Sequence, residues 1–364
     1  MIADAPAIPK PRLKFIDLAR SIAILLMLEG HFIGLTLTQE ARDPSNFIYH
    51  TWNTIRGFTA PLFFTAAGMI FVFLLTGEKS SSFFGQVRVR KGFIRAAQLL
   101  FWGYALQLSL RRFPDYLKGG FSDWIFAFHV LQCIGVGLIV LILIAALHRA
   151  IGKFSLVTFY AWGTVICLSV YVWLKSLPEG THVPDGWPQV IQNALSGPRS
   201  IFPLTPWLGY ALLGGAMGAY LRARNDQHPT LRSCSWFFIL AAGLKSIWLV
   251  AICVPMPEYA AEGIAWFTER AFEVVLFVGI LRIIEIRYGI HAPWMLRIGQ
   301  ETFAIYIFHV IVLYGGLFGF GLSDCIKEKL GPWQATGGAL VFIAFFATFA
   351  IALNLWKTQM KKNA

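Results

Sequence analysis

Charged residues are scarce in this chain. They make up 14% of its 364 residues, whereas 57% of the residues are hydrophobic and the mean hydropathy is +0.61. A soluble domain carries about 25% charged residues, so the composition excludes an ordinary soluble fold. Apolar runs of roughly 20 residues, the length that crosses a bilayer as a helix, predict an all-α polytopic membrane protein instead.

Cysteine is also rare, with five residues and no CxxC pair. This spacing predicts neither a disulfide framework nor a metal site, so we expect no metal. The sequence lacks a P-loop, a Rossmann fingerprint and a G-x-S-x-G nucleophile elbow. With so few residues outside the apolar runs, an active site has to be built by the helices and their short loops.

We expect about ten transmembrane helices in one bundle. Their approximate bounds are 15–38, 54–76, 92–110, 121–147, 153–174, 204–221, 233–254, 264–285, 298–320 and 334–356. The chain then divides into an N-terminal segment (1–14), a single transmembrane domain (15–356) and a basic tail (357–364). The longest piece outside the membrane is an outer loop at about 175–203, in which Trp187–Leu195 is predicted to form a short interfacial helix.

Lysine and arginine are distributed unequally between the two sides of the predicted membrane. Of the 31 basic residues, 18 lie on the side of the N-terminus and 8 lie in the opposite loops. Because cytoplasmic loops carry the excess of basic residues, both termini are expected in the cytoplasm and the chain in the inner membrane of a cell. The net charge of +12 follows from this bias, and no nucleic-acid partner is needed to explain it.

The first span contains ionisable side chains, each of which costs about 2.5–3.5 kcal/mol at the centre of a bilayer. Asp17, Arg20 and His31 fall on one stripe of the helix, with Arg20 and His31 about 16 Å apart along its axis. Glu29 is about 200° away from His31 and faces another way. The stripe is a functional candidate by default; the alternative is an interfacial ion pair and a hydrogen-bonded packing histidine.

Other spans carry polar groups that a hydrogen-bond network explains at least as well as catalysis does. These groups are His129 with Gln132 and Cys133, His309 with Thr302 and Tyr306, Glu269 with Arg270 and Glu273, and Lys245. His50 lies just outside the second span, beside Trp52, Asn53 and Arg56. A neutral histidine can remove a proton from a hydroxyl or amine, or carry an acyl group, so His50 is a rival of His31.

Several stretches of the sequence resemble segments of one protein family, and they occur along the chain in the same order as in that family. "FIDLARSIAILLMLEGH" resembles the opening of the transmembrane acyltransferases, with Asp three residues before Arg and ten residues between Arg and His. "YHTWNTIRGFTAPLFFTAAGMIFVFLL" resembles the heparan-α-glucosaminide N-acetyltransferase branch, where a histidine shortly before Trp-Asn is the proposed acetyl acceptor. "HVLQCIGVGLIVL", "FPLTPWLGYALLGGAMG" and "IGQETFAIYIFHVIVLY" are similar to bacterial members of that branch. The chain departs from many relatives at Ser21 and Gly30, where they have Gly and Asp.

The resemblance implies an enzyme that moves an acyl group, here an acetyl group, from cytoplasmic acetyl-CoA to an extracytoplasmic carbohydrate hydroxyl or amine. It leaves open whether His31 or His50 is the general base or acyl carrier, and it assigns Asp17 and Arg20 to the donor end. The expected donor-binding residues are Arg20, Arg88, Arg90, Lys91 and Arg95, which can bind phosphates through charge-assisted hydrogen bonds. The expected acceptor-binding residues are Trp52, Asn53, Arg56, His129 and His309.

Two other function classes are open. The intramembrane charges Lys245, Glu269, Arg270 and Glu273 would suit a proton-coupled transporter or flippase of a glycan or lipid-linked precursor, although we see no paired repeat of the kind that transporters show. A non-catalytic partner of an envelope-assembly complex is the third class. Gly214 and Gly218 form a GxxxG spacing, which predicts close helix packing and is compatible with a homodimer.

Overall fold

A computed structural model of the protein describes residues 13–77, 82–120, 123–178, 186–195, 200–224 and 230–363. Within these ranges the chain is helical, and extended pairing is limited to two isolated bridges between loop residues. The all-α prediction is confirmed. Most of the N-terminal segment and the basic residues Lys79 and Arg199 lie outside the described residues.

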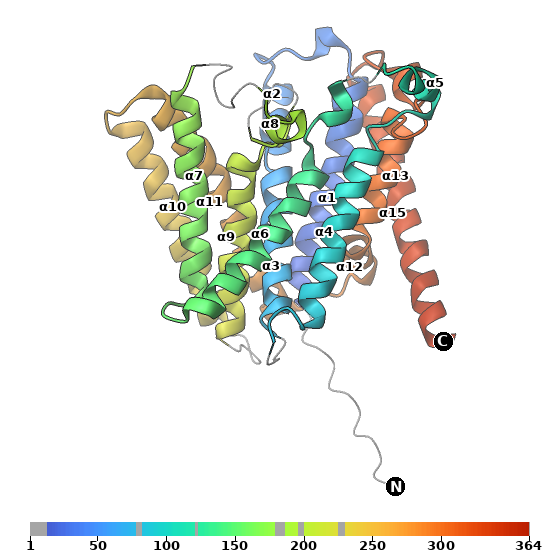
Figure 1. The fold of residues 1–364 in the computed structure, drawn as a ribbon. Helices are drawn as coiled ribbons and strands as arrows, with labels where there is room; N and C mark the ends of the chain where they lie inside the picture. The colour runs from blue at the N-terminus through green and yellow to red at the C-terminus, as the bar shows by residue number, and fades with distance from the viewer. Residues whose placement is uncertain are drawn as a thin grey trace.

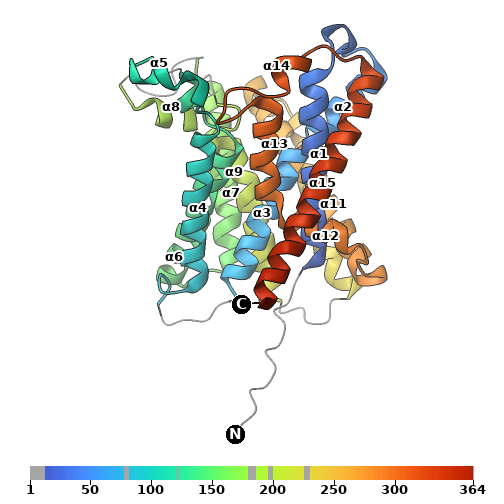
Figure 2. The same cartoon turned by 90° about the vertical axis from the view of Figure 1, so that its right-hand side faces the viewer.

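In the described part of the chain, ten long α-helices and five short ones form the bundle (Figures 1 and 2). The long helices are α1 (Lys14–Thr36), α3 (Thr59–Leu75), α4 (Val87–Ala105), α6 (Val130–Ile151), α7 (Leu156–Ser176), α9 (Leu204–Ala223), α10 (Ser235–Cys253), α11 (Glu258–Tyr288), α13 (Thr302–Tyr314) and α15 (Pro332–Asn363). The short helices are α2 (Phe47–Arg56), α5 (Phe113–Leu117), α8 (Gln189–Leu195), α12 (Pro293–Gln300) and α14 (Ser323–Ile326).

Each expected span overlaps one of the long helices. Among the described residues, six helical stretches are long and apolar enough to cross a membrane, and the bent pair of α12 and α13 would make a seventh. Several apolar helices therefore identify a multi-pass membrane protein. The count of about ten spans stays a prediction, because α4, α9 and α11 fall below that test of length and composition.

The helix ends fall at two opposite faces of the bundle. α1 begins and α15 ends at the lower face in Figure 1, where α12 also lies, whereas α2, α5 and α8 lie at the upper face. Lys14 and Lys362 are thus on one face, as the charge bias predicts for two cytoplasmic ends. The predicted helix in the outer loop is present as α8, and parts of that loop (179–185 and 196–199) lie outside the described residues.

The GxxxG spacing is used inside the chain, where α9 lies directly against α3. A Cβ atom on Gly214 would come within 2.0 Å of the Thr65 carbonyl oxygen, and one on Gly218 within 2.2 Å of the Met69 carbonyl oxygen. Only glycine permits this backbone approach, which brings both helices into van der Waals contact. The face with the two glycines is buried, so the spacing is not available to a homodimer and gives no support to that prediction.

α1 is the helix around which the candidate residues gather. A large apolar cluster includes buried side chains of α1, α3, α6, α9 and α11, and a second cluster lies between α1 and α15. Leu28 of α1 and Phe346 of α15 are almost completely buried in the second cluster. Apolar packing on two sides of α1 leaves its polar stripe facing α12 and α13, whose bend of 70° places polar residues beside both ends of α1.

Candidate functional site

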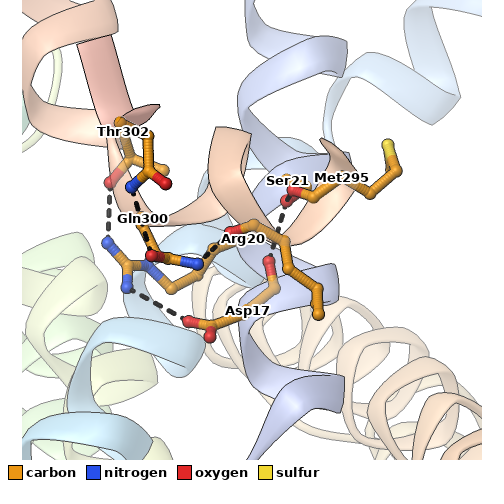
Figure 3. A network of polar contacts seen from close by, with 8 residues as sticks. Asp17, Arg20, Ser21, Met295, Gln300 and Thr302 are labelled. Carbon is orange, nitrogen blue, oxygen red and sulfur yellow. Dashed lines mark hydrogen bonds and ion pairs between the residues drawn. The ribbon is translucent and has the colours of Figure 1, made fainter. Parts of the chain in front are cut away.

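The inner end of the predicted stripe is a polar network around Arg20 (Figure 3). The Arg20 guanidinium donates a hydrogen bond to the Thr302 hydroxyl over 2.8 Å and lies 3.8 Å from the Asp17 carboxylate. The Ser21 hydroxyl donates to the carbonyl oxygens of Asp17 and Met295. Asp17 and Thr302 are buried and Arg20 is half-buried. The planar guanidinium fork therefore joins α1 to the first residue of α13.

A second guanidinium lies close to the first. Arg95 of α4 is placed over the Phe303 ring, 3.8 Å from its centroid, and its charge interacts with that of Arg20. The positive charges of Arg20 and Arg95 together exceed the single negative charge of Asp17, which pairs with Arg20, and this excess favours an anionic ligand. Arg90 and Lys91 are exposed in the first turns of α4 and Arg88 is half-buried there. The structure thus brings Arg20 and Arg95 close to each other, and the other predicted donor-binding residues lie nearer the start of α4.

The outer end of the stripe is a pair of histidines from different helices. Nδ1 of His31 on α1 lies 2.9 Å from Nε2 of His309 on α13, and the ring centroids are 5.1 Å apart. Nδ1 of His309 lies 3.1 Å from the Ile305 carbonyl oxygen, one turn earlier in α13. His309 is completely buried, whereas His31 is only half-buried. His31 is therefore the histidine of the pair with access to a ligand.

Two tyrosines enclose the histidine pair. The Tyr314 ring meets the His31 ring edge-on at 5.9 Å, and the Tyr306 ring meets the His309 ring in the same way at 5.0 Å. Tyr306 was expected on the face of His309, but Tyr314 was not predicted from the sequence. Tyr314 lies five residues after His309, and residues at that spacing do not share a face of a helix. It contacts His31 because α13 crosses α1. No sequence signal indicates such a contact between helices.

Arg56 brings a cation to the outer histidine. Its side chain extends from α2 along α1, so that a Cβ atom on Gly30 would lie 3.2 Å from its Cγ and one on Gly34 would lie 3.3 Å from its Cζ. The Arg56 charge acts on Glu29, His31 and Tyr314. Gly30 thus provides the space in which Arg56 passes. Arg56 lies near His31, and its predicted role in acceptor binding stays a prediction.

Trp52 connects α2 to α1 through Glu29. The indole Nε1 of Trp52 donates to the Glu29 carboxylate over 2.5 Å, and its ring carries the Arg56 guanidinium 5.5 Å from the centroid. The Glu29 carboxylate thus contacts α2, and it takes no part in the contact between His31 and His309. His50 and Asn53 are exposed on α2, and His50 is about 200° from Trp52 on that helix. The structure brings Trp52 and Arg56 to the site, while His50 projects from the opposite face of α2.

The remaining predicted acceptor-binding histidine lies elsewhere. His129 precedes α6, where its ring contacts Trp124 at 5.0 Å and its backbone N–H donates to the Gln132 side chain over 3.3 Å. His129 was expected inside a span; it lies in the candidate span Asp123–Ile151, one residue before α6 begins at Val130. Gln132, which was expected on the same face as His129, accepts the backbone N–H of His129 with its side chain and so caps the start of α6. His309, also predicted to bind the acceptor, is too deeply buried to touch it and contacts His31 instead.

Among the charged residues that would suit a transporter, Arg270, Glu273 and Lys245 have partners within the bundle. Arg270 pairs with Glu273 over 2.8 Å and lies against Gly57 of the turn between α2 and α3. Lys245 lies over the Trp248 ring, 3.2 Å from its centroid, and 5.4 Å from that of Phe272. These cation–π contacts stabilise the Lys245 ammonium group inside the bundle.

Two surface cavities of about 380 and 370 Å³ lie away from the polar stripe. The first is at the inner ends of α3, α6 and α7 and includes His148 and Arg149 in its lining. The second is apolar and includes Phe101 and Phe126. Neither is lined by Asp17, Arg20 or His31. A passage along the stripe for an acyl group therefore stays a prediction.

Comparison with known proteins identifies one family. The model of the heparan-alpha-glucosaminide N-acetyltransferase catalytic family matches residues 12–250, which includes the stripe on α1, all of α2 and the basic start of α4. Thr302 and His309 lie outside the matched residues. No curated protein sequence matches this chain.

Proposed function

The chain belongs to the heparan-alpha-glucosaminide N-acetyltransferase catalytic family, and from this membership we propose that it transfers an acetyl group from cytoplasmic acetyl-CoA to a carbohydrate amine or hydroxyl on the opposite side of an inner membrane. The family supports a membrane acetyltransferase. The proposal goes further and specifies the donor, the acceptor, the side of the membrane on which each binds, and the residues that act on them. Acetyl-CoA is here a substrate and is released as CoA.

The single observation that carries the proposal is the polar edge of α1. Arg20 with Thr302 marks one end of this edge and His31 with His309 marks the other, about 16 Å apart along the helix. CoA has an anionic nucleotide and a thioester at opposite ends of an extended arm. Arg20 and Arg95 suit the anionic end by charge, and His31 suits the thioester end because it is a neutral base.

In the proposed reaction His31 acts as a general base. Its unprotonated ring nitrogen takes the proton of the acceptor N–H or O–H while the acceptor nitrogen or oxygen attacks the thioester carbonyl carbon. The new C–N or C–O bond forms, the C–S bond breaks, and the proton passes from His31 to the departing CoA thiolate. The Arg56 guanidinium, beside His31, would stabilise the negative charge that develops on the carbonyl oxygen.

His31 is preferred to His50 as the base because of its surroundings. His31 is held by a second histidine and lies beside Arg56, whereas His50 is exposed on α2. Direct transfer of the acetyl group needs only one base. A covalent route through an acetyl-histidine would use the same His31 nitrogen as nucleophile, and both routes require His31 to be neutral.

The test is an acetyl-transfer assay on purified protein with labelled acetyl-CoA and methyl α-glucosaminide as acceptor. His31→Ala is expected to lower turnover by about 10²–10⁴-fold, the usual effect of losing a general base, and His50→Ala is expected to keep most of it. Acetyl-CoA should raise the thermal midpoint of both variants, because a ligand that binds the native state stabilises it. Full turnover in His31→Ala would contradict the assignment, and absence of CoA binding in the unaltered protein would contradict the enzyme itself.

A further inference from the structure

His309 has two hydrogen-bond contacts that together fix the positions of protons. Its Nδ1 lies 3.1 Å from the Ile305 carbonyl oxygen. A carbonyl oxygen only accepts, so Nδ1 of His309 carries a hydrogen and donates it. A neutral imidazole has a single N–H, and Nε2 of His309 therefore has a free lone pair.

His309 is neutral for a physical reason. Its side chain is completely buried, and its two nitrogens contact a carbonyl oxygen and another imidazole, both uncharged. An imidazolium here would lose its hydration without a carboxylate to compensate, and such burial of an unpaired charge is strongly unfavourable. The Arg56 guanidinium of α2 acts on His31, and the uncharged Tyr306 and Tyr314 rings of α13 meet the two imidazoles edge-on.

The proton positions in His31 follow from those in His309. Nε2 of His309 is an acceptor, and it lies 2.9 Å from Nδ1 of His31. Nδ1 of His31 must therefore carry the hydrogen of that bond. In neutral His31 the other nitrogen, Nε2, is then unprotonated. The carbonyl of Ile305 thus determines, through His309, which nitrogen of His31 is the base.

We propose that His309 is a positioning residue that holds His31 in the Nδ1–H tautomer and so exposes Nε2 of His31 as the reacting base; this inference rests on the proposed function. When Nε2 takes the acceptor proton, His31 becomes an imidazolium whose Nδ1–H still donates to His309. That hydrogen bond becomes charge-assisted and stronger, so the contact favours the transition state over the ground state. A buried aspartate has the corresponding role in the serine hydrolases, and here a neutral histidine takes it.

The test compares His309→Gln with His309→Met in the acetyl-transfer assay. The Gln side-chain oxygen can accept from Nδ1–H of His31, whereas Met fills the buried volume without an acceptor. We expect kcat to fall at least about tenfold in His309→Met and to be largely retained in His309→Gln, with the KM for acetyl-CoA unchanged in both. A role in packing predicts the opposite order, because a buried amide is less favourable than a thioether.

A double variant separates this inference from the proposed function. If His309 acts only through His31, adding His309→Met to His31→Ala should cause no further loss of kcat. Greater or equal kcat in His309→Met than in His309→Gln would overturn the tautomer inference while a loss in His31→Ala still supports the proposed base. Unchanged kcat in His31→Ala would overturn both. Thermal unfolding with acetyl-CoA verifies that each variant is folded and binds the donor.

Discussion

The indole Nε1 of Trp52 donates a hydrogen bond to the Glu29 carboxylate over 2.5 Å. This bond holds α2 against α1 at the level where Arg56 passes Gly30 and Gly34. The same indole ring carries the Arg56 guanidinium. Trp52 thus supplies a hydrogen-bond donor to the Glu29 carboxylate and holds the Arg56 guanidinium near His31.

Replacing Trp52 by Phe should remove the hydrogen bond and keep an aromatic ring under Arg56. A half-buried carboxylate that loses its donor costs about 1–3 kcal/mol of stability, and turnover should fall with it because α2 is no longer fixed. Glu29→Gln should be milder, since the amide oxygen still accepts. Trp173→Phe, at an exposed tryptophan of α7, is the matched control. Thermal unfolding in detergent and kcat measure both effects; equal behaviour of Trp52→Phe and Trp173→Phe would contradict the role of the bond.

Arg20→Lys should weaken acetyl-CoA binding by about tenfold even though the charge is kept. The ammonium group of lysine is a single point charge and cannot contact Asp17 and Thr302 in the fork geometry that arginine provides. The affinity of the unaltered protein should also fall as salt is raised, because screening shortens the reach of exposed charges to about 10 Å at 0.1 M. Calorimetric titration measures both effects, with Arg287→Lys as control. The same affinity in Arg20→Lys would remove Arg20 from the donor site.

Gly218→Leu should prevent folding of the bundle. Its Cβ would come within 2.2 Å of the Met69 carbonyl oxygen, and backbone cannot move aside without separating α3 from α9. Gly243→Leu is the matched control, because a Cβ at Gly243 on α10 meets nothing within 4 Å. Yield of monodisperse protein after detergent extraction distinguishes the variants. Recovery of folded Gly218→Leu would show that the close approach is not required.

The predicted membrane sides can be tested with cysteines. Cys325 is exposed in α14, at the face opposite the end of α15 (Figure 2). In a Cys253→Ser variant, which removes the other exposed cysteine of the described residues, a membrane-impermeant maleimide should label Cys325 in intact cells. In a variant with Cys253→Ser, Cys325→Ser and Thr358→Cys, labelling should require permeabilised cells, since Thr358 lies near the C-terminal end of α15. Labelling of the second variant in intact cells would reverse the orientation inferred from the basic residues.

The sequence predicted the helices and the polar stripe because both follow from local periodicity. A helix of known pitch places Asp17, Arg20 and His31 on one edge whatever surrounds it. The partners of that edge could not be predicted in the same way, because Thr302 and His309 meet α1 only through the bend between α12 and α13. The position of His50 was also undetermined, since sequence does not fix which face of a short helix packs. His129 lies in the expected span but precedes the first residue of α6, because the start of a regular helix depends on capping and not on hydrophobicity alone.

The most direct measurement is acetyl transfer across a sealed membrane. Proteoliposomes hold methyl α-glucosaminide inside, and labelled acetyl-CoA is added outside. If the acetyl group crosses the bilayer, acetylated sugar should form inside the vesicles and little product should form when donor and acceptor are both supplied only outside. His31→Ala protein should give at most about a hundredth of the product. Equal product formation with both substrates outside would contradict transfer between opposite faces, and unchanged transfer by His31→Ala would contradict the central place given to the edge of α1.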